Sequence, residues 1–264
     1  MKNKQIRLEE MFSKNQLYTV LKKEFSDPEI LSKLEELNVP LSFGLKVLMN
    51  LYLYKQADVP TLVGLTRAEY NLKEVETYLL KMVEGDLMDF DPLSEKFISL
   101  FDIDPQVKKE MEMYQFPLPM IVEPAKVKNN HTNGYLKVNN TSLLLNNSFH
   151  KEDICLDHIN RVNRVPLSVD LDVAFNIKNV WKNLDKKSSK ETMKEFHKRV
   201  KNYQNYMKTA YTVMELLVQE GNKIYLTHAY DKRGRTYSRG YHVLDQGNDW
   251  NKACIQFFNK EVIE

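Results

Sequence analysis

The sequence contains few cysteines, glycines and prolines, and each scarcity excludes a class of protein. Its 264 residues include two cysteines, Cys155 and Cys254, and no CxxC pair, which excludes a disulfide framework and a cysteine-based zinc site. This usage fits a reducing cytoplasm. Eight glycines, nine prolines and 28% charged residues are typical of a helix-rich soluble protein, and not of a β-sandwich or a disordered chain.

Long hydrophobic runs are also missing. The first residues, MKNKQIRLEEMF, are interrupted by charges and lack the apolar region of a signal peptide. Nowhere does an apolar run reach the roughly 18 residues that a membrane-spanning helix requires. We therefore expect no contact with a membrane. The 42% of hydrophobic residues is enough for the cores of one large or two small domains.

A strong excess of one charge is absent from the chain as a whole, whose net charge is +2, but its two halves differ. Residues 1–125 hold 15 Lys and Arg against 21 Asp and Glu, a balance of −6, whereas residues 126–264 hold 23 against 15, a balance of +8. A polyanion such as a nucleic acid is therefore expected to bind the C-terminal half. The same balance also fits an ordinary solvated surface.

Residues 1–114 are predicted to form a helical N-terminal domain. One helix is expected over residues 5–25. Asp27 can cap a second helix that begins with Pro28. A third helix opens after Pro40, and its run LSFGLKVLMNLYLYKQ is apolar enough to be buried on most sides and to form the core.

Within this domain, residues 45–100 approximately are predicted to be winged-helix-like, because they follow the order helix, helix and small hairpin. A helix is expected over residues 72–83 with Gly85 as its stop, and LMDF and KFISL are expected to pair. Such modules often bind DNA. The expected recognition helix, however, balances Lys73 and Lys81 with two glutamates, so a structural or protein-contacting role is favoured over base reading.

Residues 115–183 are predicted to complete the domain with strands, loops and helices. The prolines of QFPLPMIVEPAKV favour extended chain, and the asparagine-rich NNHTNGYLKVNNTSLLLNN favours loops and short strands. Helix resumes near Ile154, is interrupted at Pro166 and restarts through SVDLDVAFNIKNVWKNL. In this last stretch apolar residues recur at helical spacing, namely Val169, Val173, Ile177, Val180 and Trp181.

Residues 184–221 are predicted to contain one long amphipathic helix. Over residues 189–220 the apolar residues follow steps of three and four without a break, which predicts a helix roughly 48 Å long at about 1.5 Å per residue. Because Glu191 and Glu195 can pair with neighbouring cations such as Arg199, the charges fit either a solvated face or a surface for phosphate. The cations in question form a stripe of four lysines, Lys190, Lys194, Lys198 and Lys201.

Residues 222–264 carry the most specific motif. KIYLTHAY and TYSRGYHV are predicted to pair as strands, which places DKRGR at the tip of a hairpin, where Gly234 can take a positive φ. Arg233 and Arg235 then present two guanidinium groups at a fixed separation. Each can hold a phosphate bidentately, and Asp231 can orient one of them. An ordinary charged turn would have the same composition.

Two tyrosines and a capped helix follow the tip. Tyr237 and Tyr241 can stack on a base or a sugar, and Asn248 or Asp249 can cap the helix WNKACIQFF. Taken together, DKRGRTY, QGND and this helix resemble the DxxGR block of the single-subunit RNA polymerases of phages and mitochondria. The long helix resembles the thumb of that family, and INRVNRVP resembles the segment ahead of the thumb. Leu167 stands where a tryptophan usually follows, and residues 1–110 show no resemblance.

The resemblance implies a fold and a set of contacts. The fold is mainly α with small β parts, an α+β fold that comprises the N-terminal domain, the thumb helix and the first part of the palm of a right-hand polymerase. Asp231 and Gly234 would shape the turn, and the lysine stripe would lie along the RNA:DNA hybrid. The residues expected to contact template DNA and nascent RNA are Arg233, Arg235, Tyr237, Arg239 and the four lysines.

The catalytic centre of that family follows the DxxGR block. The resemblance implies two aspartates that hold a pair of Mg²⁺ ions and a fingers helix with a lysine. This chain ends at Glu264, so either it is a fragment or a larger partner chain carries the fingers and the rest of the palm, as in the two-subunit polymerases of certain phages. A start at Met1 and an end in a loop favour the second alternative.

We therefore expect the small subunit of such an enzyme, located in the cytoplasm of an infected bacterial host. It would have no catalytic or metal-binding residues of its own, and the Mg²⁺ ligands would lie on the partner. A helper protein that binds single-stranded DNA is a further candidate partner.

Two other functions remain open. A DNA-binding regulator or adaptor would use the winged-helix-like segment and the basic half without polymerase activity. It would bind duplex DNA sequence-specifically and alone, whereas a polymerase subunit would favour single strands or hybrids. A self-sufficient hydrolase has little support, since the six histidines are scattered and no nucleophile motif is present.

Overall fold

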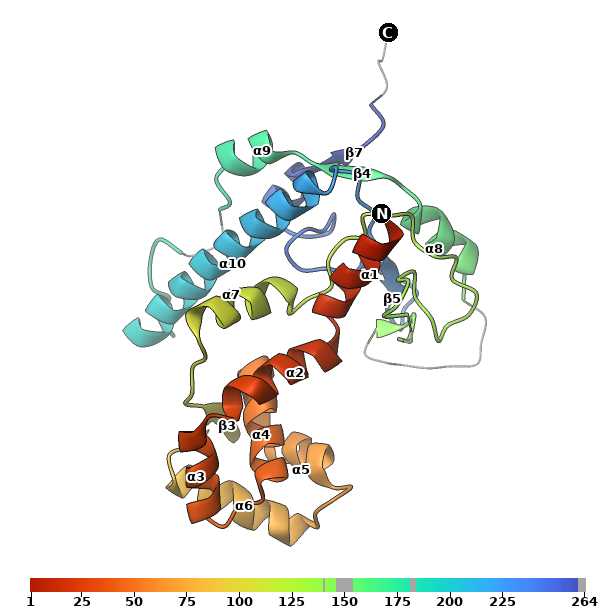
Figure 1. The fold of residues 1–264 in the computed structure, drawn as a ribbon. Coiled ribbons are helices and arrows are strands. Elements are labelled where there is room, and N and C mark those ends of the chain that lie inside the picture. The colour runs from red at the N-terminus through yellow and green to blue at the C-terminus, as the bar shows by residue number, and fades with distance from the viewer. Residues whose placement is uncertain (140, 146–153, 181–183, 261–264) are drawn as a thin grey trace. The chain divides into compact units, whose positions relative to one another are not determined.

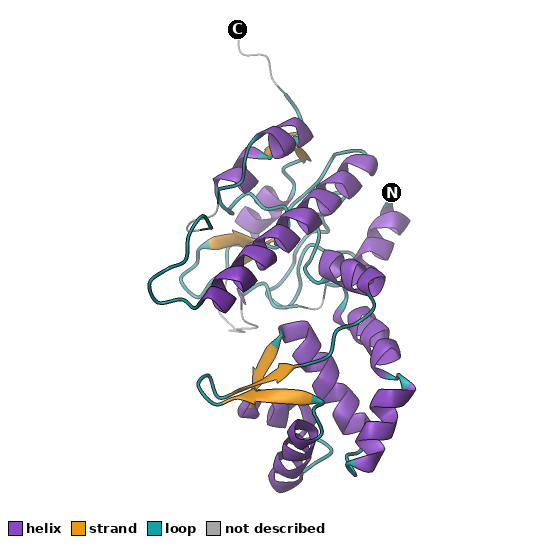
Figure 2. Cartoon of the chain, turned by 90° about the vertical axis from the view of Figure 1, so that its left-hand side faces the viewer, coloured by secondary structure: helices purple, strands orange, loops and turns teal. Residues whose placement is uncertain are grey.

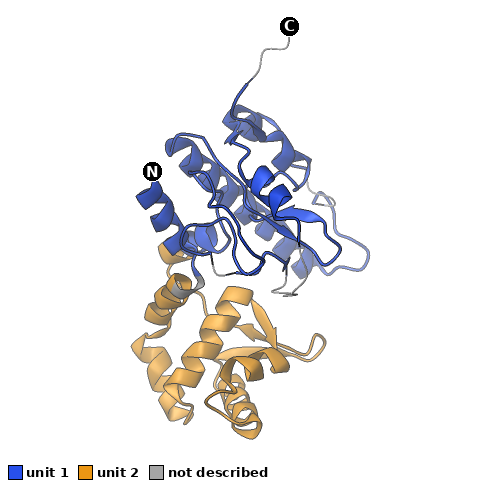
Figure 3. Ribbon diagram, turned by 90° about the vertical axis from the view of Figure 1, so that its right-hand side faces the viewer, with its two compact units in different colours: residues 1–13, 109–264 blue, residues 14–108 orange. Residues whose placement is uncertain are grey.

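The structure, a computed structural model, divides into two compact units (Figure 3). One consists of residues 14–108 and the other of residues 1–13 together with 109–264. Both contain helices and small antiparallel sheets, which confirms the α+β class. The residues that the structure describes are 1–139, 141–145, 154–180 and 184–260.

The unit of residues 14–108 is built around α4. Asp27 accepts the N–H of Glu29 at 2.9 Å and Pro28 occupies the first turn of α3, so the predicted start of this helix is confirmed. α4 is buried along most of its length, as its apolar run predicts. The elements are α2 (Lys14–Phe25), α3 (Pro28–Glu36), α4 (Leu41–Tyr54), β1 (Gln56–Asp58), α5 (Val59–Thr66), α6 (Leu72–Glu84), β2 (Met88–Asp91) and β3 (Lys96–Ser99).

From α4 to β3 the order is helix, strand, helix, helix and hairpin, which is the order of a winged-helix module. The strands of this unit form a sheet, drawn in orange in Figure 2, in which β3 lies between β1 and β2 and Phe90 is opposite Phe97. The hairpin predicted from LMDF and KFISL is therefore confirmed. α6 begins with a capping box between Asn71 and Glu74 and ends at Gly85, close to the predicted bounds.

The other unit contains the long helix and two small sheets (Figure 1). Its elements are α1 (Lys2–Met11), most of α7 (Pro105–Tyr114), α8 (Leu156–Asn163), β4 (Leu167–Val169), α9 (Leu171–Asn176), α10 (Met193–Gln219), β5 (His228–Tyr230), β6 (Thr236–Ser238), α11 (Asp249–Ala253) and β7 (Ile255–Phe257). β4 pairs with β7, and β5 pairs with β6. In the ranges that are described, no helix has the length and hydropathy to cross a bilayer.

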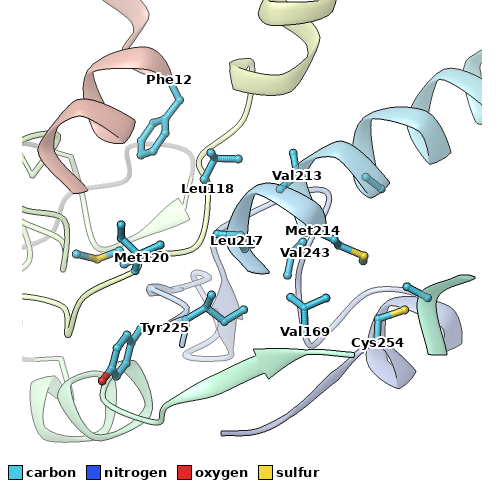
Figure 4. Packing of buried hydrophobic residues seen from close by; sticks show 14 of the residues in the cluster. Phe12, Leu118, Met120, Val169, Val213, Met214, Leu217, Tyr225, Val243 and Cys254 are labelled. Atoms are coloured by element: carbon cyan, nitrogen blue, oxygen red, sulfur yellow. The ribbon is translucent and has the colours of Figure 1, made fainter. Parts of the chain in front are cut away.

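The core of this unit surrounds the second half of α10 (Figure 4). Val213, Met214 and Leu217 are fully buried there, whereas the first half of the helix is largely exposed. Residues from distant parts of the chain pack against them, among them Phe12, Leu118, Met120, Val169, Tyr225, Val243, Trp250 and Cys254. The stretch before the hairpin and the helix after it are thus anchored in the same core as α10.

Because of this shared core, the compact units group the chain differently from the predicted domains. The ranges 115–183, 184–221 and 222–264 all fall within one unit, and the range 1–114 is divided between both. α7 was not predicted. Over residues 115–145 the described chain forms loops with isolated bridges, such as Met120 to Tyr225, instead of longer strands, and residues 140 and 146–150 lie outside the described residues.

The helix predicted over residues 5–25 is wrong in one respect, because the chain leaves it at Phe12 and Ser13. α1 and α2 are separate helices and belong to different units. Phe12 is 6% exposed and packs edge-to-face on Tyr135, with ring centroids 5.4 Å apart. This packing ends α1, since the ring is held in the core of its own unit.

Two buried polar side chains also attach α1 to its unit. The carboxylate of Glu9 is fully buried and accepts the backbone N–H groups of residues 136–138 at 2.9, 2.5 and 3.0 Å. It further accepts Nε2 of Gln5 at 2.9 Å, and Oε1 of Gln5 accepts the N–H of Ile121 at 2.8 Å. A charged residue in α1 therefore acts as the acceptor for a distant loop.

The helix predicted through SVDLDVAFNIKNVWKNL is wrong over most of its length. Val169 belongs to β4, only Leu171–Asn176 is helical, and Ile177 is extended with φ −97° and ψ 120°. Asp170 caps the short helix by accepting the N–H of Val173 at 3.0 Å. Apolar spacing over so few residues does not distinguish a strand followed by one helical turn from a longer helix. Trp181, the last residue of that pattern, lies outside the described residues.

Candidate nucleic-acid interface

The DxxGR motif lies at the tip of a two-stranded hairpin, in which Tyr230 of β5 is opposite Thr236 of β6. The tip is closed by the N–H of Asp231, which donates to the carbonyl of Arg235 at 2.9 Å, and by the N–H of Gly234, which donates to the carbonyl of Asp231 at 3.0 Å. Gly234 has a φ of +78°, which residues with side chains rarely adopt. The predicted hairpin is confirmed, with shorter strands than expected.

Asp231 organises the tip with both carboxylate oxygens. Oδ1 accepts the backbone N–H groups of Arg233 and Arg235 at 2.8 and 2.9 Å. Oδ2 accepts Nε and Nη2 of Arg235, both at 2.7 Å, and lies 3.4 Å from Nε of Arg233. Partial desolvation raises the pKa of Asp231, but the hydrogen bonds and the charge of Arg235 outweigh it and lower the pKa overall. Asp231 therefore stays ionised and orients Arg235.

The guanidinium groups of the tip remain accessible to a ligand. The side chains of Arg233 and Arg235 are 73% and 51% exposed, whereas that of Asp231 is 15% exposed. Lys232 is also exposed, so residues 231–235 present three cations and one carboxylate. Because a guanidinium has five N–H donors, Arg235 can bind Asp231 and still donate to a phosphate.

Aromatic rings near the tip already have partners on one face. The guanidinium carbon of Arg235 lies 5.5 Å from the centroid of the half-buried Tyr237 ring. Tyr241 stacks on Phe116 with centroids 4.1 Å apart and is 41% exposed. A base stacked on either tyrosine would therefore use the opposite face of the ring.

Gln246, the first residue of QGND, joins the following loop to the hairpin. Its Oε1 accepts the N–H of Ser238 at 3.0 Å, and its Nε2 donates to the carbonyl of Thr236 at 3.0 Å. Asn248 then caps α11 by accepting the N–H of Asn251 at 2.9 Å, which confirms one of the two predicted caps. The helix is shorter than predicted, because WNKACIQFF continues into β7. The bonds of Gln246 were not predicted, since a glutamine after a short loop is too common a pattern.

The asparagines of INRVNRVP position the hairpin from α8. Oδ1 of Asn163 accepts the backbone N–H of His228 in β5 at 2.9 Å. Asn160 bonds both the N–H and the carbonyl of Val127, at 2.8 and 2.9 Å. Sequence reasoning identified this segment only by resemblance and missed these contacts, which join residues far apart in the chain.

Arg239 differs from the other predicted contact residues, because its guanidinium is directed into the protein. Nη2 donates to the carbonyl of Ser142 at 2.5 Å, and Nε is buried without a hydrogen-bond partner among the described residues. Burial lowers the pKa of Arg239. A contact with nucleic acid would require this side chain to leave its present position.

Three of the four predicted lysines lie on the exposed first half of α10. Lys194, Lys198 and Lys201 are exposed and form no ion pair within the part of the chain that is described. Lys190 lies in a turn before the helix, so the prediction that it belongs to the helical stripe is wrong. The reason is the capping box of Thr192, because this N-cap lies two residues after Lys190 and α10 begins at the next residue, Met193.

The acidic residues expected to neutralise these lysines are bound elsewhere. Glu191 accepts Nε and Nη2 of Arg199, both at 2.8 Å, and this hydrogen bonding is the largest cause that lowers the pKa of Glu191 to about 2. Glu195 accepts the N–H of Thr192 at 2.7 Å as part of the capping box. Neither of these described carboxylates therefore forms an ion pair with the lysines of α10.

A cavity of about 490 Å³ adjoins the hairpin. Nε2 of His158 in α8 is 3.1 Å from the hydroxyl of Thr236, and Nε2 of His228 is 4.0 Å from Oδ2 of Asp245. The proximity of His228 is the largest of the effects that lower the pKa of Asp245. These contacts join the hairpin to α8 and to the loop before α11.

Among the residues that are described, no group of three or more His, Cys, Asp or Glu side chains is placed to hold a metal ion. A scan of the sequence against models of protein families gives no match, and a search of curated proteins gives none either. The geometry of the hairpin and the charge of α10 are therefore the observations from which a function has to be inferred.

Proposed function

We propose that this chain is the subunit of a two-chain RNA polymerase of the phage and mitochondrial type that holds the template and the RNA:DNA hybrid. The observation that carries this proposal is the tip of the hairpin, where Asp231 orients Arg235 and leaves two exposed guanidinium groups. Arg235 would bind the backbone near the growing end of the RNA. Arg233 and Tyr237 would contact the template.

The first half of α10 supports the same function. Its three exposed lysines follow one another at steps of four and three residues, and so lie along one side of the helix. Because no described acidic side chain pairs with them, their charge is available to phosphates of the hybrid.

β7 supports the presence of a partner chain. It pairs on one side with β4, and no described strand pairs with its other side. Phe257 and Phe258 are 67% and 39% exposed. An open strand edge with exposed aromatic rings is a site for association. We therefore propose that a larger subunit, which carries the fingers and the rest of the palm, covers this edge. Its aspartates would hold the Mg²⁺ ions that activate the 3′ hydroxyl and neutralise the triphosphate.

A DNA-binding regulator is the alternative, and the winged-helix order of the other unit favours it. The expected recognition helix, α6, nevertheless exposes Leu72 and Leu80 and carries as many acidic as basic residues in its first three turns. This surface does not suit the phosphate backbone of duplex DNA.

Binding of labelled nucleic acids by the purified chain tests the proposal. We expect an RNA:DNA hybrid and single-stranded DNA to bind more tightly than duplex DNA of the same sequence. Arg235→Ala should weaken hybrid binding about tenfold, because a charge-assisted contact is lost. Arg67→Ala, which removes an exposed arginine of the other unit, is the matched control and should have no effect.

Activity gives a second test. The chain alone should make no RNA, and co-expression with an adjacent phage gene product that carries two separated aspartates should restore synthesis on single-stranded template. Robust synthesis by the isolated chain would contradict the proposal. Sequence-specific binding to duplex DNA, unaffected by Arg235→Ala, would instead favour the regulator.

A further inference from the structure

The unit of residues 14–108 has an apolar groove of about 420 Å³ between α5, α6 and the β2–β3 hairpin. Among its described lining residues Glu76 is the one that is polar. The apolar walls come from all three elements and include Val59 and Val63, Leu72 and Leu80, and Phe90 and Phe97.

α6 carries apolar side chains on two different faces. Val75 and Met82 are buried at 1% and 0% exposure and belong to the core. Leu72 and Leu80 are 64% and 56% exposed and line the groove, with Glu76 midway between them at steps of four residues. Packing within the unit explains the first face but not the second. A contiguous exposed apolar surface of this kind marks a site for a partner.

The net charge of the segment that forms the groove limits what this partner can be. Residues 58–96 contain nine acidic residues, Glu76 among them, against four basic ones, a balance of −5. Hydrogen bonds from Ser94 and Leu93 lower the pKa of Asp91, so this carboxylate of the hairpin stays ionised. A segment with this excess of negative charge, and with Glu76 inside the groove itself, repels nucleic acid and attracts lysine and arginine side chains.

We propose that this groove binds an amphipathic helix of another protein, whose apolar residues repeat at steps of three and four and whose flanking residues are basic. The apolar side chains occupy the space between Leu72, Leu80 and the two phenylalanines, and a cationic side chain pairs with Glu76. This inference depends on residues 14–108 alone and is independent of the polymerase function proposed for the hairpin.

Two synthetic peptides serve as probes for the full-length chain. Both are amphipathic helices with leucines on one face, and their other residues are all lysine in one peptide and all glutamate in the other. We expect the lysine peptide to bind saturably in fluorescence anisotropy, and the glutamate peptide to bind at least about tenfold more weakly. Added salt should weaken the binding of the lysine peptide.

Variants assign this binding to the groove. Leu80→Ser removes an anchor from the groove and should weaken the lysine peptide about tenfold. Leu93→Ser is the matched control, since Leu93 is 98% exposed and is not among the residues that line the groove. Glu76→Lys should reverse the preference between the peptides. Because these side chains are exposed, circular dichroism should show that each variant stays folded.

Several outcomes would overturn the inference. They are equal binding of the two peptides, an equal effect of Leu80→Ser and Leu93→Ser, and no saturable binding of the lysine peptide. A dimer of the chain that Leu80→Ser dissociates would assign the groove to a second copy and would overturn it as well. None of these outcomes changes the binding of hybrid through Arg235, so the two proposals can fail separately.

Discussion

Removal of the carboxylate of Glu9 is expected to destabilise the unit of residues 1–13 and 109–264 strongly. The side chain is fully buried and accepts four hydrogen bonds, three from the backbone of residues 136–138 and one from Gln5. In Glu9→Ala all four donors lose their acceptor. In Glu9→Gln one oxygen becomes an NH₂ group that faces N–H donors, so part of the network is lost.

The size of the effect follows from the burial of the donors. A hydrogen bond to a charged group contributes about 1.5–3 kcal/mol, and a buried donor without an acceptor costs about 1–3 kcal/mol. Leu136 and Val138 are half-buried and Lys137 is exposed, so water can replace some of the lost bonds. We therefore expect Glu9→Ala to lower the free energy of unfolding by about 3–5 kcal/mol and Glu9→Gln by about 2–3 kcal/mol.

Urea unfolding monitored by tryptophan fluorescence measures the change in the free energy of unfolding, because Trp250 is buried in the core of the same unit. Glu10→Ala is the control. Glu10 is exposed and pairs with Lys137, and an exposed pair of this kind contributes at most about 1 kcal/mol. If Glu9→Ala and Glu10→Ala shift the unfolding transition equally, the acceptor function assigned to Glu9 is refuted.

Two further predictions concern pH and salt. Burial lowers the pKa of His242 to about 4, so the folded state disfavours the protonated ring. The free energy of unfolding of this unit should therefore be highest above a pH of about 6.5 and should decrease as the pH is lowered toward 4. Urea unfolding at a series of pH values should show this decrease, and His242→Phe should flatten it; an unchanged profile would contradict the assignment. Replacement of Lys194, Lys198 and Lys201 by Gln should reduce the slope of log K against log salt for hybrid binding by about 2, at roughly 0.7 for each lysine. Lys46→Gln in the other unit should leave this slope unchanged, and an unchanged slope in the triple variant would remove α10 from the interface.

Features that depend on a few neighbouring residues could be predicted from the sequence. Asp27 and Pro28 start α3, Gly85 ends α6, and Gly234 allows the turn of the DxxGR hairpin. Each of these signals acts through the backbone within one turn of chain. The helix over residues 72–84 and the hairpin after it follow from such local signals, whereas β1, which pairs with β3 forty residues later, was not predicted.

Features that depend on contacts between distant residues could not be predicted. Tertiary packing determines the two hydrogen bonds between Gln246 and the backbone of β6, and it directs the guanidinium of Arg239 into the protein. No local pattern indicates either feature. Lys190 is an example of a local pattern that gave a wrong prediction. Its spacing fits the stripe of lysines, but the capping box of Thr192 begins the helix after it. Local spacing therefore identified the residues of the candidate interface better than it identified their orientation.

The division of the chain has a consequence for its synthesis. Residues 14–108 are inserted between two segments that share one core, so α1 leaves the ribosome more than a hundred residues before the loop that Glu9 binds. At about 5–20 residues per second this delay is on the order of ten seconds. During that time the inserted unit can become compact, since its helices and its sheet lie within its own boundaries. Although it is synthesised before the inserted unit, α1 is thus among the last helices to reach its final neighbours.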